Sequence, residues 1–415
     1  MTETLAVRIL GAAEGTYVDR NVDRAYAHDG TGTQALAAYQ NFRTSHAGVK
    51  NPEKLSLIYD HIAPANNSTT ANLQGTLRSF AERENISLYD IGSGICHQIL
   101  SEGVCLPNEV VVGADSHSCT LGALGAFATG VGATDMAGIW TTGQTWFRVP
   151  ASIGIVLNGK LRDHAEPKDA ALTYVKKLGM DGGTYKALEF IGDGAEAMPM
   201  EGRLTLCNMA IETGAKTGLF YADRCTKAYL GSYGVAEEKI SLQERGDCSY
   251  EKEISLDLDN IEPLLAVDNR VDTAVPVSTY AGTPVDQVLV GTCTNGRYED
   301  LQRFAGIVRG KRVAVRTLVV PASKAVYRKA AASGIIMDLI DAGCVICPPG
   351  CGPCLGVHMG VLGEGETGLS TANRNFKNRM GVGATYYLCS PSTAAASALT
   401  GEITSPNELA GGIGT

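Results

Sequence analysis

Apolar runs of strand length, each ending in a polar or glycine-rich loop, recur along the chain. The sequence predicts such strands at residues 55–59, 87–91, 109–112, 152–157, 288–290, 312–320, 344–347 and 384–389. Apolar residues at helical spacing predict helices at residues 5–14, 69–84, 167–178, 201–215, 298–309, 324–342 and 392–400. Residues 122–142, rich in glycine and alanine, are predicted to form a closely packed helix pair. Strands alternating with helices indicate an α/β fold with mostly parallel sheets.

Two changes in composition suggest domain boundaries. One lies near Arg148-Val149-Pro150, and residues 268–275 resemble a linker that follows a charged, exposed segment at 250–261. A chain of 415 residues is too long for one ordinary core. We therefore predict three α/β/α domains, at residues 1–148, 149–275 and 276–415.

The overall charge and the N-terminal residues narrow the possible partners and compartment. The net charge of −9 makes nucleic acid and anionic membranes poor partners. No apolar run approaches the roughly 20 residues of a membrane span, and the first residues lack the pattern of an export signal. Twelve cysteines in such a chain favour reduced thiols in the cytoplasm.

Cysteines follow two of the predicted strands. Cys351 and Cys354 form a C-x-x-C pair after the strand at 344–347, and Cys293 follows the strand at 288–290. Three thiolates at adjacent strand ends make an incomplete ligand set for a four-cornered metal cluster, with one corner left for substrate. Cys344 and Cys347 keep an alternative open, because with the C-x-x-C pair they complete a four-thiolate zinc site. Simple burial is a third interpretation.

Histidines and aspartates occupy three further strand ends. Asp60-His61 follows one strand, His97 lies in the loop after the next, and Asp115 and His117 follow a third. A carboxylate beside an imidazole fixes its tautomer and raises its basicity, which suits a general acid. A lone histidine is more often structural, so the repeated placement carries the hypothesis.

Two weaker sequence patterns add further candidate site residues. Asn208 and Glu212 share a face of a predicted helix. Arg374 and Arg379 lie five residues apart in a polar loop and suit a di- or tricarboxylate, although the residues alone favour a solvated basic loop.

Taken together, the motifs resemble the aconitase superfamily, and most closely the large subunits of its two-chain isopropylmalate dehydratase and homoaconitase branch. The matching segments occur in family order over nearly the whole chain: His28-Asp29-Gly30-Thr31-Gly32, Asp60-His61, Gly113-Ala114-Asp115-Ser116-His117, Gly291-Thr292-Cys293-Thr294-Asn295, Gly350-Cys351-Gly352-Pro353-Cys354 and Asn373-Arg374-Asn375-Phe376. The resemblance implies three α/β/α domains around a central [4Fe–4S] cleft.

The resemblance also implies roles for the candidate residues. Cys293, Cys351 and Cys354 would hold a [4Fe–4S] cluster whose fourth iron acts as a Lewis acid on the substrate. His61, paired with Asp60, would protonate the departing hydroxyl. Further catalytic residues would be His97, Asp115, His117 and Glu212. Substrate contacts would come from Ser116, Asn208, Arg374 and Arg379.

A partner follows from the same resemblance. Single-chain aconitases carry a fourth, swivelling domain with the serine base, whereas this chain ends soon after residues 401–403. We expect a separate small subunit that carries this domain, in a heterodimer or heterotetramer. The large chain alone should bind the cluster and turn over poorly.

The expected activity is that of a hydro-lyase or isomerase acting on a small hydroxy acid. The first hypothesis is reversible conversion of 2-isopropylmalate to 3-isopropylmalate, a step of leucine biosynthesis. Homoaconitate, citramalate and 2,3-dimethylmalate remain open as substrates. A non-enzymatic cluster or RNA-binding protein is the alternative from another class, which the acidic balance and the absence of basic–aromatic patches disfavour.

Overall fold

A computed structural model describes residues 3–42, 48–162 and 164–411. The chain separates into two compact units. Unit 1 comprises residues 1–157 and 181–255, and unit 2 comprises residues 158–180 and 256–415. The chain thus leaves unit 1 for one helix of unit 2, returns, and then completes unit 2.

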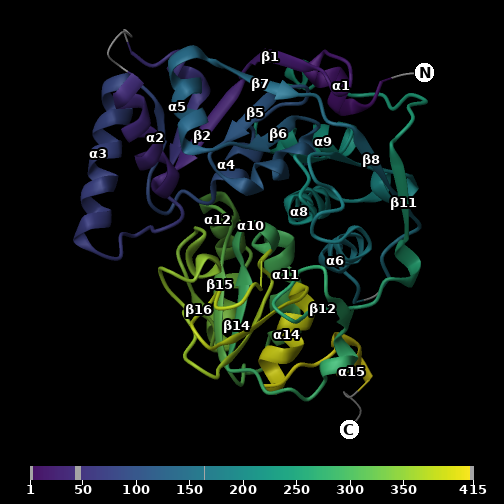
Figure 1. The fold of residues 1–415 in the computed structure, drawn as a ribbon. Helices are drawn as coiled ribbons and strands as arrows, with labels where there is room; N and C mark the ends of the chain where they lie inside the picture. The colour runs from purple at the N-terminus through teal and green to yellow at the C-terminus, as the bar shows by residue number, and fades with distance from the viewer. Residues whose placement is uncertain (1–2, 43–47, 163, 412–415) are drawn as a thin grey trace. The chain divides into compact units, whose positions relative to one another are not determined.

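Unit 1 contains three sheets and the helices that cover them (Figure 1). Its strands are β1 (Tyr17–Asn21), β2 (Arg24–His28), β3 (Leu55–Ile58), β4 (Ser87–Tyr89), β5 (Val110–Gly113), β6 (Phe127–Gly130), β7 (Gln144–Arg148), β8 (Ser152–Asn158), β9 (Ala187–Ile191), β10 (Thr217–Leu219) and β11 (Lys252–Asp257). Its α-helices are α1 (Leu5–Leu10), α2 (Asp29–Phe42), α3 (Ser68–Glu84), α4 (Cys96–Ser101), α5 (Ala133–Thr142), α7 (Asp193–Ala197), α8 (Met200–Met209) and α9 (Arg224–Ser232). Two 3₁₀ helices matter below, η3 (Ser116–Leu124) and η4 (Ala210–Thr213).

The five-stranded sheet of unit 1 has the order β4-β3-β2-β5-β6, and all its neighbouring strands are parallel. Helices α2, α3 and α5 pack beside it, and Trp140 of α5 lies against Tyr39 of α2 and Phe80 of α3. A second sheet has the order β10-β9-β8-β11, and β1 pairs antiparallel with β7. The helices cover the apolar faces of the five-stranded sheet and hold its parallel strands in place. The carboxyl ends of these strands therefore lie along one edge.

Unit 2 is built on one seven-stranded sheet. Its strands are β12 (Leu264–Ala266), β13 (Ala274–Pro276), β14 (Gln287–Gly291), β15 (Arg316–Val320), β16 (Val345–Ile346), β17 (Thr367–Ser370) and β18 (Thr385–Leu388). Its α-helices are α6 (Pro167–Leu178), α10 (Thr292–Asn295), α11 (Tyr298–Val308), α12 (Lys324–Ala332), α13 (Ile335–Asp341), α14 (Pro391–Thr400) and α15 (Pro406–Gly411). The 3₁₀ helix η8 (Gly352–Leu355) follows β16, which is an edge strand of this sheet.

The unit 2 sheet has the order β13-β12-β18-β17-β14-β15-β16. Strands β14 to β18 are parallel, whereas β12 is antiparallel to both of its neighbours. Helix α11 buries Leu301, Phe304 and Val308 at helical spacing, and both α11 and α14 pack against β14 (Figure 1). The predicted α/β class with mostly parallel sheets is confirmed.

Several predicted elements are wrong. The helix pair at 122–142 is instead the end of η3, strand β6 and helix α5, because Gly125 ends the 3₁₀ helix in a left-handed conformation. The single helix at 324–342 divides into α12 and α13 at Gly334, which also has a positive φ. The charged segment at 250–261 contains β11, and the linker at 268–275 contains the start of β13.

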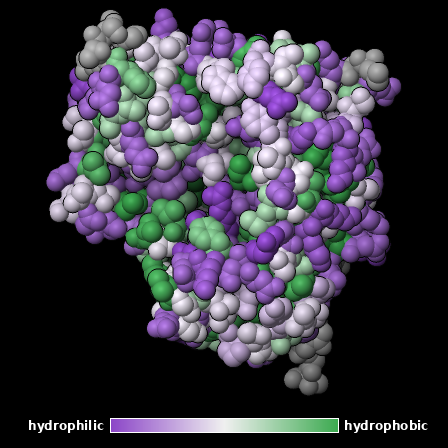
Figure 2. All heavy atoms as spheres, in the orientation of Figure 1, coloured by the Kyte–Doolittle hydropathy of each residue, from purple (hydrophilic) through white to green (hydrophobic). Residues whose placement is uncertain are grey.

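The two compact units described above do not test the predicted division into three domains, which stays a prediction. Each of the three larger sheets draws its strands from one stretch of the chain, with β12 and β13 joining the last. Within the described residues, no helix is both long and apolar enough to cross a membrane. On the face drawn in Figure 2, hydrophilic and hydrophobic residues are interspersed.

Candidate active site

The order of strands in the five-stranded sheet of unit 1 explains why distant polar residues meet. Strands β3, β2 and β5 are neighbours, and they end at Ile58, His28 and Gly113. Because parallel strands share a carboxyl edge, the loops that follow them lie side by side. Those loops carry Asp60-His61, Asp29 and Asp115, and helix α4 adds His97 after β4.

Asp115 is the centre of this group. Its Oδ1 lies 3.1 Å from His97 Nε2 and its Oδ2 lies 3.3 Å from His61 Nε2. His28 Nε2 lies 3.8 Å from Oδ2, and His117 Nδ1 lies 3.7 Å from Oδ1. Burial raises the pKa of the Asp115 carboxyl, but the charge of His97 and hydrogen bonds from the surrounding imidazoles lower it well below its usual value. Asp115 is therefore ionised at neutral pH.

His61 is held between two carboxylates. Its Nδ1 lies 2.7 Å from Oδ1 of Asp60, which is completely buried and accepts the backbone N–H of Cys96 on its other oxygen. Burial lowers the pKa of His61, but the charges of Asp60 and Asp115 outweigh that effect, so the pKa stands well above 6.5. His61 is therefore a protonated imidazole at neutral pH, as a general acid requires.

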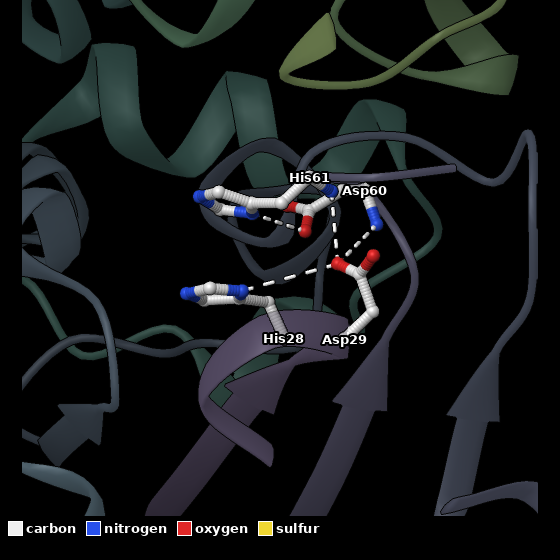
Figure 3. Close-up of side chains that lie close together, drawn as sticks. All are labelled: His28, Asp29, Asp60 and His61. Carbon is white, nitrogen blue, oxygen red and sulfur yellow. Dashed lines mark hydrogen bonds and ion pairs between the residues drawn. The ribbon is translucent and has the colours of Figure 1, made fainter. Parts of the chain in front are cut away.

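Asp29 fixes the loop that carries His61. Its carboxylate accepts the backbone N–H of His61 at 2.9 Å (Figure 3). It also accepts the backbone N–H of Ile62 at 2.8 Å. His28 and His61 stack with ring centroids 3.6 Å apart, and Figure 3 shows the two rings lying parallel. Burial raises the pKa of Asp29, but the hydrogen bond with His28 and the charge of His61 hold it well below its usual value. Three carboxylates, of Asp29, Asp60 and Asp115, thus lie within 4 Å of the stacked imidazoles.

Tyr26 orients His97 from the opposite side. The Tyr26 hydroxyl lies 2.8 Å from His97 Nδ1 and donates to Ser118 Oγ at 2.7 Å. A side chain at Gly113 would lie 2.3 Å from the Tyr26 ring, so glycine is required where that ring crosses strand β5. The arrangement turns His97 Nε2 toward Asp115.

Glu212 and Asn208 join the same group. Glu212 Oε1 lies 2.9 Å from His117 Nε2, and Asn208 donates to Thr120 Oγ1 at 2.9 Å. The two residues do not share one α-helix, because α8 ends at Met209 and Glu212 belongs to the 3₁₀ helix η4. Glu212 thus contacts His117, and Asn208 contacts Thr120 on η3, the 3₁₀ helix that carries His117.

Ser116 has a different environment. Its hydroxyl lies 3.4 Å from His117 Nδ1, and the residue lines a hollow of about 530 Å³ together with Asp135, Tyr185 and Lys216. It lies at the edge of the histidine group of unit 1.

The cysteine loops of unit 2 meet at Asn373. The Asn373 amide donates to Cys293 Sγ at 3.2 Å, and its Oδ1 lies 3.8 Å from Cys354 Sγ. Cys293 is the second residue of the short helix α10 after β14. Cys354 lies on η8, and Cys351, the residue before η8, is half-buried. The Cys354 N–H donates to the Cys351 carbonyl at 3.1 Å, which holds these two cysteines on one turn.

Arginines fix the backbone around these thiols. Arg379 donates to the Cys354 carbonyl at 2.9 Å, and its guanidinium lies over the Phe376 ring. Arg297 is buried and donates to the carbonyls of Cys293 and Thr294 at 2.9 and 2.7 Å. Arg374 lies half-buried in the same loop as Arg379. The cysteine loops are therefore surrounded by positive charge.

The zinc interpretation depended on Cys344 and Cys347. Cys344 belongs to the apolar core of unit 2, and burial raises the pKa of its thiol to about 12. Cys347 packs with Leu289 and Val320, and burial raises the pKa of its thiol too. Both environments oppose the thiolate form that a metal needs.

The donor set of unit 2 fits an iron–sulfur cluster. Cys293, Cys351 and Cys354 are soft ligands on two neighbouring loops, and the Arg379 guanidinium lies 3.9 Å from Cys354 Sγ. Among the described residues, the groups compact enough for a single ion lie in unit 1: His28, Asp29, Asp60 and His61 form one, and Cys96, His97 and Asp115 the other. The cysteines of unit 2 supply no such compact group within that part of the chain.

Comparison with known proteins agrees with this chemistry. A model of the aconitase family (aconitate hydratase) matches residues 6–401. The chain belongs to the aconitase family. It is therefore a hydro-lyase of a family of iron–sulfur enzymes.

Named relatives of this family member cover nearly its full length. A probable methanogen homoaconitase large subunit from Methanosarcina mazei is 50% identical over 94% of this chain and 99% of its own. A 3-isopropylmalate dehydratase large subunit from Thermotoga maritima is 45% identical over 99% of this chain and 100% of its own. The crystal structure of aconitase X from Thermococcus kodakaraensis has a TM-score of 0.53 at 13% identity, covering 86% of this chain and 84% of that one, and shows the shared fold.

Sequence reasoning missed three residues that the structure places beside the candidates. His28 ends strand β2, a position that the same strand-end argument identifies. Asn373 occurs in a matching motif but gave no sign of contacting sulfur. Nothing in the sequence indicated that Lys168 is buried, because a lysine on a predicted helix is ordinarily exposed.

Proposed function

We propose that the chain is the large subunit of a [4Fe–4S]-dependent hydro-lyase that dehydrates and rehydrates a hydroxy di- or tricarboxylate. The observation that carries the proposal is the gathering of buried imidazoles around one ionised carboxylate, Asp115. Dehydration of a hydroxy acid needs a proton for a poor leaving group, and His61, which is protonated at neutral pH, supplies it.

Proton transfer is assigned to histidines and carboxylates of unit 1. His61, oriented by Asp60, donates the proton to the departing hydroxyl. Asp115, together with Asp60, keeps His61 charged, and His97, His117 and Glu212 complete the group of interacting side chains around Asp115.

Substrate binding is assigned to a second set of residues. Arg374 and Arg379 suit a carboxylate by bidentate hydrogen bonds, with Ser116 and Asn208 as further contacts. The positive charge of the arginines attracts an anionic substrate to a chain whose net charge is −9.

Cys293, Cys351 and Cys354 are proposed to hold the cluster. When bound, the cluster supplies Lewis-acid polarisation of the substrate hydroxyl and carboxylate. Support comes from Asn373, which contacts two of the three sulfurs, and from the arginines around the loops.

Two substrates are supported by the names of relatives. We place 2-isopropylmalate first, with 3-isopropylmalate as product. Homoaconitate is the second candidate, because the Methanosarcina relative at 50% identity is named a homoaconitase large subunit. Citramalate and 2,3-dimethylmalate are retained in the test.

A small-subunit partner belongs to the proposal. Relatives named as large subunits imply a smaller chain, and we propose that it carries the swivelling domain with the base. A cytoplasmic location suits cysteines that must stay reduced to bind iron.

The test is an anaerobic assay of the reconstituted chain, mixed with the small subunit from the same organism, against the four hydroxy acids or their dehydrated forms. We expect turnover of 2-isopropylmalate or the homoaconitase substrate, with little activity from the large chain alone. His61→Gln should lower kcat by roughly 10²- to 10⁴-fold without changing iron and sulfide content. Undiminished turnover by His61→Gln would refute the assigned acid.

A further inference from the structure

Lys168 is a completely buried lysine in unit 2, on helix α6. Its Nζ donates to the carbonyl of Thr371 at 2.9 Å and to the carbonyl of Ala372. These two residues directly follow strand β17 and directly precede Asn373, whose amide contacts two of the proposed ligand sulfurs. Lys168 therefore lies behind the cysteine loops.

Thr371 connects this lysine to the other loop. The Thr371 hydroxyl accepts the N–H of Gly291 at 2.9 Å, and Gly291 is the last residue of β14 before the Thr292–Asn295 helix that carries Cys293. One ammonium group thus braces the backbone at the ends of both β14 and β17.

No carboxylate neutralises this ammonium in the part of the chain that the structure describes. No ion pair among those residues includes Lys168. Neighbouring Asp169 accepts the N–H groups of Leu264 and Glu166, and burial raises its pKa to about 8, so it is mostly neutral at pH 7. Glu166 faces Arg303 instead, at 3.3 Å. A buried ammonium without an anion is costly, so an anion is expected beside it.

The candidate anions are Cys293 and Cys354, which are thiolates when they hold a cluster. Burial lowers the pKa of Lys168 to about 8, while Cys389, Cys354, Cys293 and, to a smaller extent, Asp169 act in the opposite direction. The lysine therefore remains mostly charged at pH 7, and the sulfurs are near enough to interact with that charge. Three thiolates around a [4Fe–4S] core give the bound cluster a net negative charge.

We propose that Lys168 is a positioning residue that supplies the fixed positive charge for the bound cluster, behind the Cys293 and Cys354 loops. This inference rests on the proposed function, because it requires that the cysteines hold a cluster. It assigns to Lys168 a stabilising role toward the cluster rather than contact with substrate.

Two variants separate charge from hydrogen bonding. Lys168→Met removes the charge and both hydrogen bonds, whereas Lys168→Gln removes the charge and keeps an N–H donor. Lys176→Met is the matched control, because Lys176 lies exposed on the same helix.

The readouts are the rate at which a chelator extracts iron from the reconstituted chain and the midpoint potential of the cluster. In both Lys168 variants we expect iron loss to be roughly 10- to 100-fold faster, the range for residues that support metal ligands. We also expect a more negative potential, because a nearby positive charge favours the reduced cluster. Lys176→Met should match the wild type in both.

Thermal unfolding of the cluster-free chain provides the decisive comparison. If the charge serves the cluster, cluster-free Lys168→Met should be no less stable than the cluster-free wild type. Lower stability of that variant, or an unchanged potential, would overturn the inference in favour of a structural lysine. Recovery of wild-type iron retention by Lys168→Gln would overturn it in favour of hydrogen bonding alone. A wild-type chain that takes up no [4Fe–4S] cluster would instead overturn the proposed function, and this inference with it.

Discussion

Asp60 shows how one buried carboxylate prepares a general acid. One of its oxygens orients His61 Nδ1 and the other accepts the N–H of Cys96, so the side chain cannot turn away. Its charge helps to keep His61 protonated although burial opposes that state. The acidity of His61 is thus set by its neighbours rather than by exposure.

Replacing Asp60 should shift the pH dependence of the reaction. Asp60→Asn removes a charge that raises the pKa of His61, so the imidazole loses its proton at a lower pH. The alkaline limb of kcat/KM, measured with the small subunit present, should therefore move to lower pH. Asp19→Asn, a change at an exposed position of the same unit, should leave the profile unchanged. An alkaline limb that stays in place in Asp60→Asn would contradict the assignment of His61.

Asp29 stabilises the loop beneath His61 by accepting backbone N–H groups from residues 60–62. A carboxyl whose folded-state pKa is lowered contributes stability above its unfolded pKa of about 3.9, and this contribution is lost as pH falls through the folded value. Asp29→Asn should lower the free energy of unfolding by about 1.5–3 kcal/mol at pH 7, and this loss should become smaller below about pH 4.

Tryptophan fluorescence can follow this change selectively. The chain's two tryptophans, Trp140 and Trp146, both lie in unit 1, so denaturant unfolding monitored by their emission reports the unit that contains Asp29. A destabilisation by Asp29→Asn that is equal at pH 7 and at pH 3 would show that the charge of Asp29 is not what stabilises the loop.

At the scale of single residues, the sequence predicted most of the histidine group. Alternation of strand and loop was enough to bring His61, His97 and Asp115 to one sheet edge. The same reasoning could not find Lys168, because its burial depends on packing between α6 and loops about 200 residues away. Nor could it find Asn373 as the residue shared by two cysteine loops.

At the scale of elements, the turn from β14 into the cysteine helix depends on a glycine. Gly291 has a φ of +127°, and a Cβ there would lie 2.0 Å from the Val320 carbonyl oxygen of the adjacent strand. Gly291→Ala should destabilise unit 2 by about 1–3 kcal/mol or more and abolish cluster uptake, because Cys293 follows two residues later.

Gly306→Ala is the matched control in helix α11 of the same unit. A Cβ at Gly306 meets nothing within 4 Å, so alanine should stabilise the helix by roughly 0.5–1 kcal/mol and leave cluster uptake intact. The measurements are the thermal midpoint and the absorbance of the reconstituted cluster. Normal cluster uptake by Gly291→Ala would show that this turn does not set the position of Cys293.

Elements were predicted best where apolar spacing was long and regular. Helix α6 has the predicted bounds, and α3 differs by one residue. The segment at 122–142 failed because strand β6 is only four residues long, and so short an apolar run cannot be distinguished from a buried helix by periodicity. Helical spacing places Leu73 on one face with Leu77, Phe80 and Ala81, yet Leu73 is 47% exposed while the other three are buried.

At the scale of the whole molecule, the chemistry is divided between the units. Unit 1 supplies the protonated histidine and its carboxylates, and unit 2 supplies the thiols and arginines. The sequence predicted both sets, because each follows strand ends, and its division into three domains stays a prediction.

The central claim is that Cys293, Cys351 and Cys354 hold the cluster while Cys344 and Cys347 are packing residues. The direct measurement is iron and acid-labile sulfide per chain after anaerobic reconstitution of the five single variants, with serine at the first three positions and alanine at the other two. We predict that each serine variant loses the intact [4Fe–4S] cluster and that Cys344→Ala and Cys347→Ala keep wild-type iron and sulfide. Retention of the cluster by Cys293→Ser, with loss of metal from Cys344→Ala and Cys347→Ala, would contradict the account and support a four-thiolate site in its place.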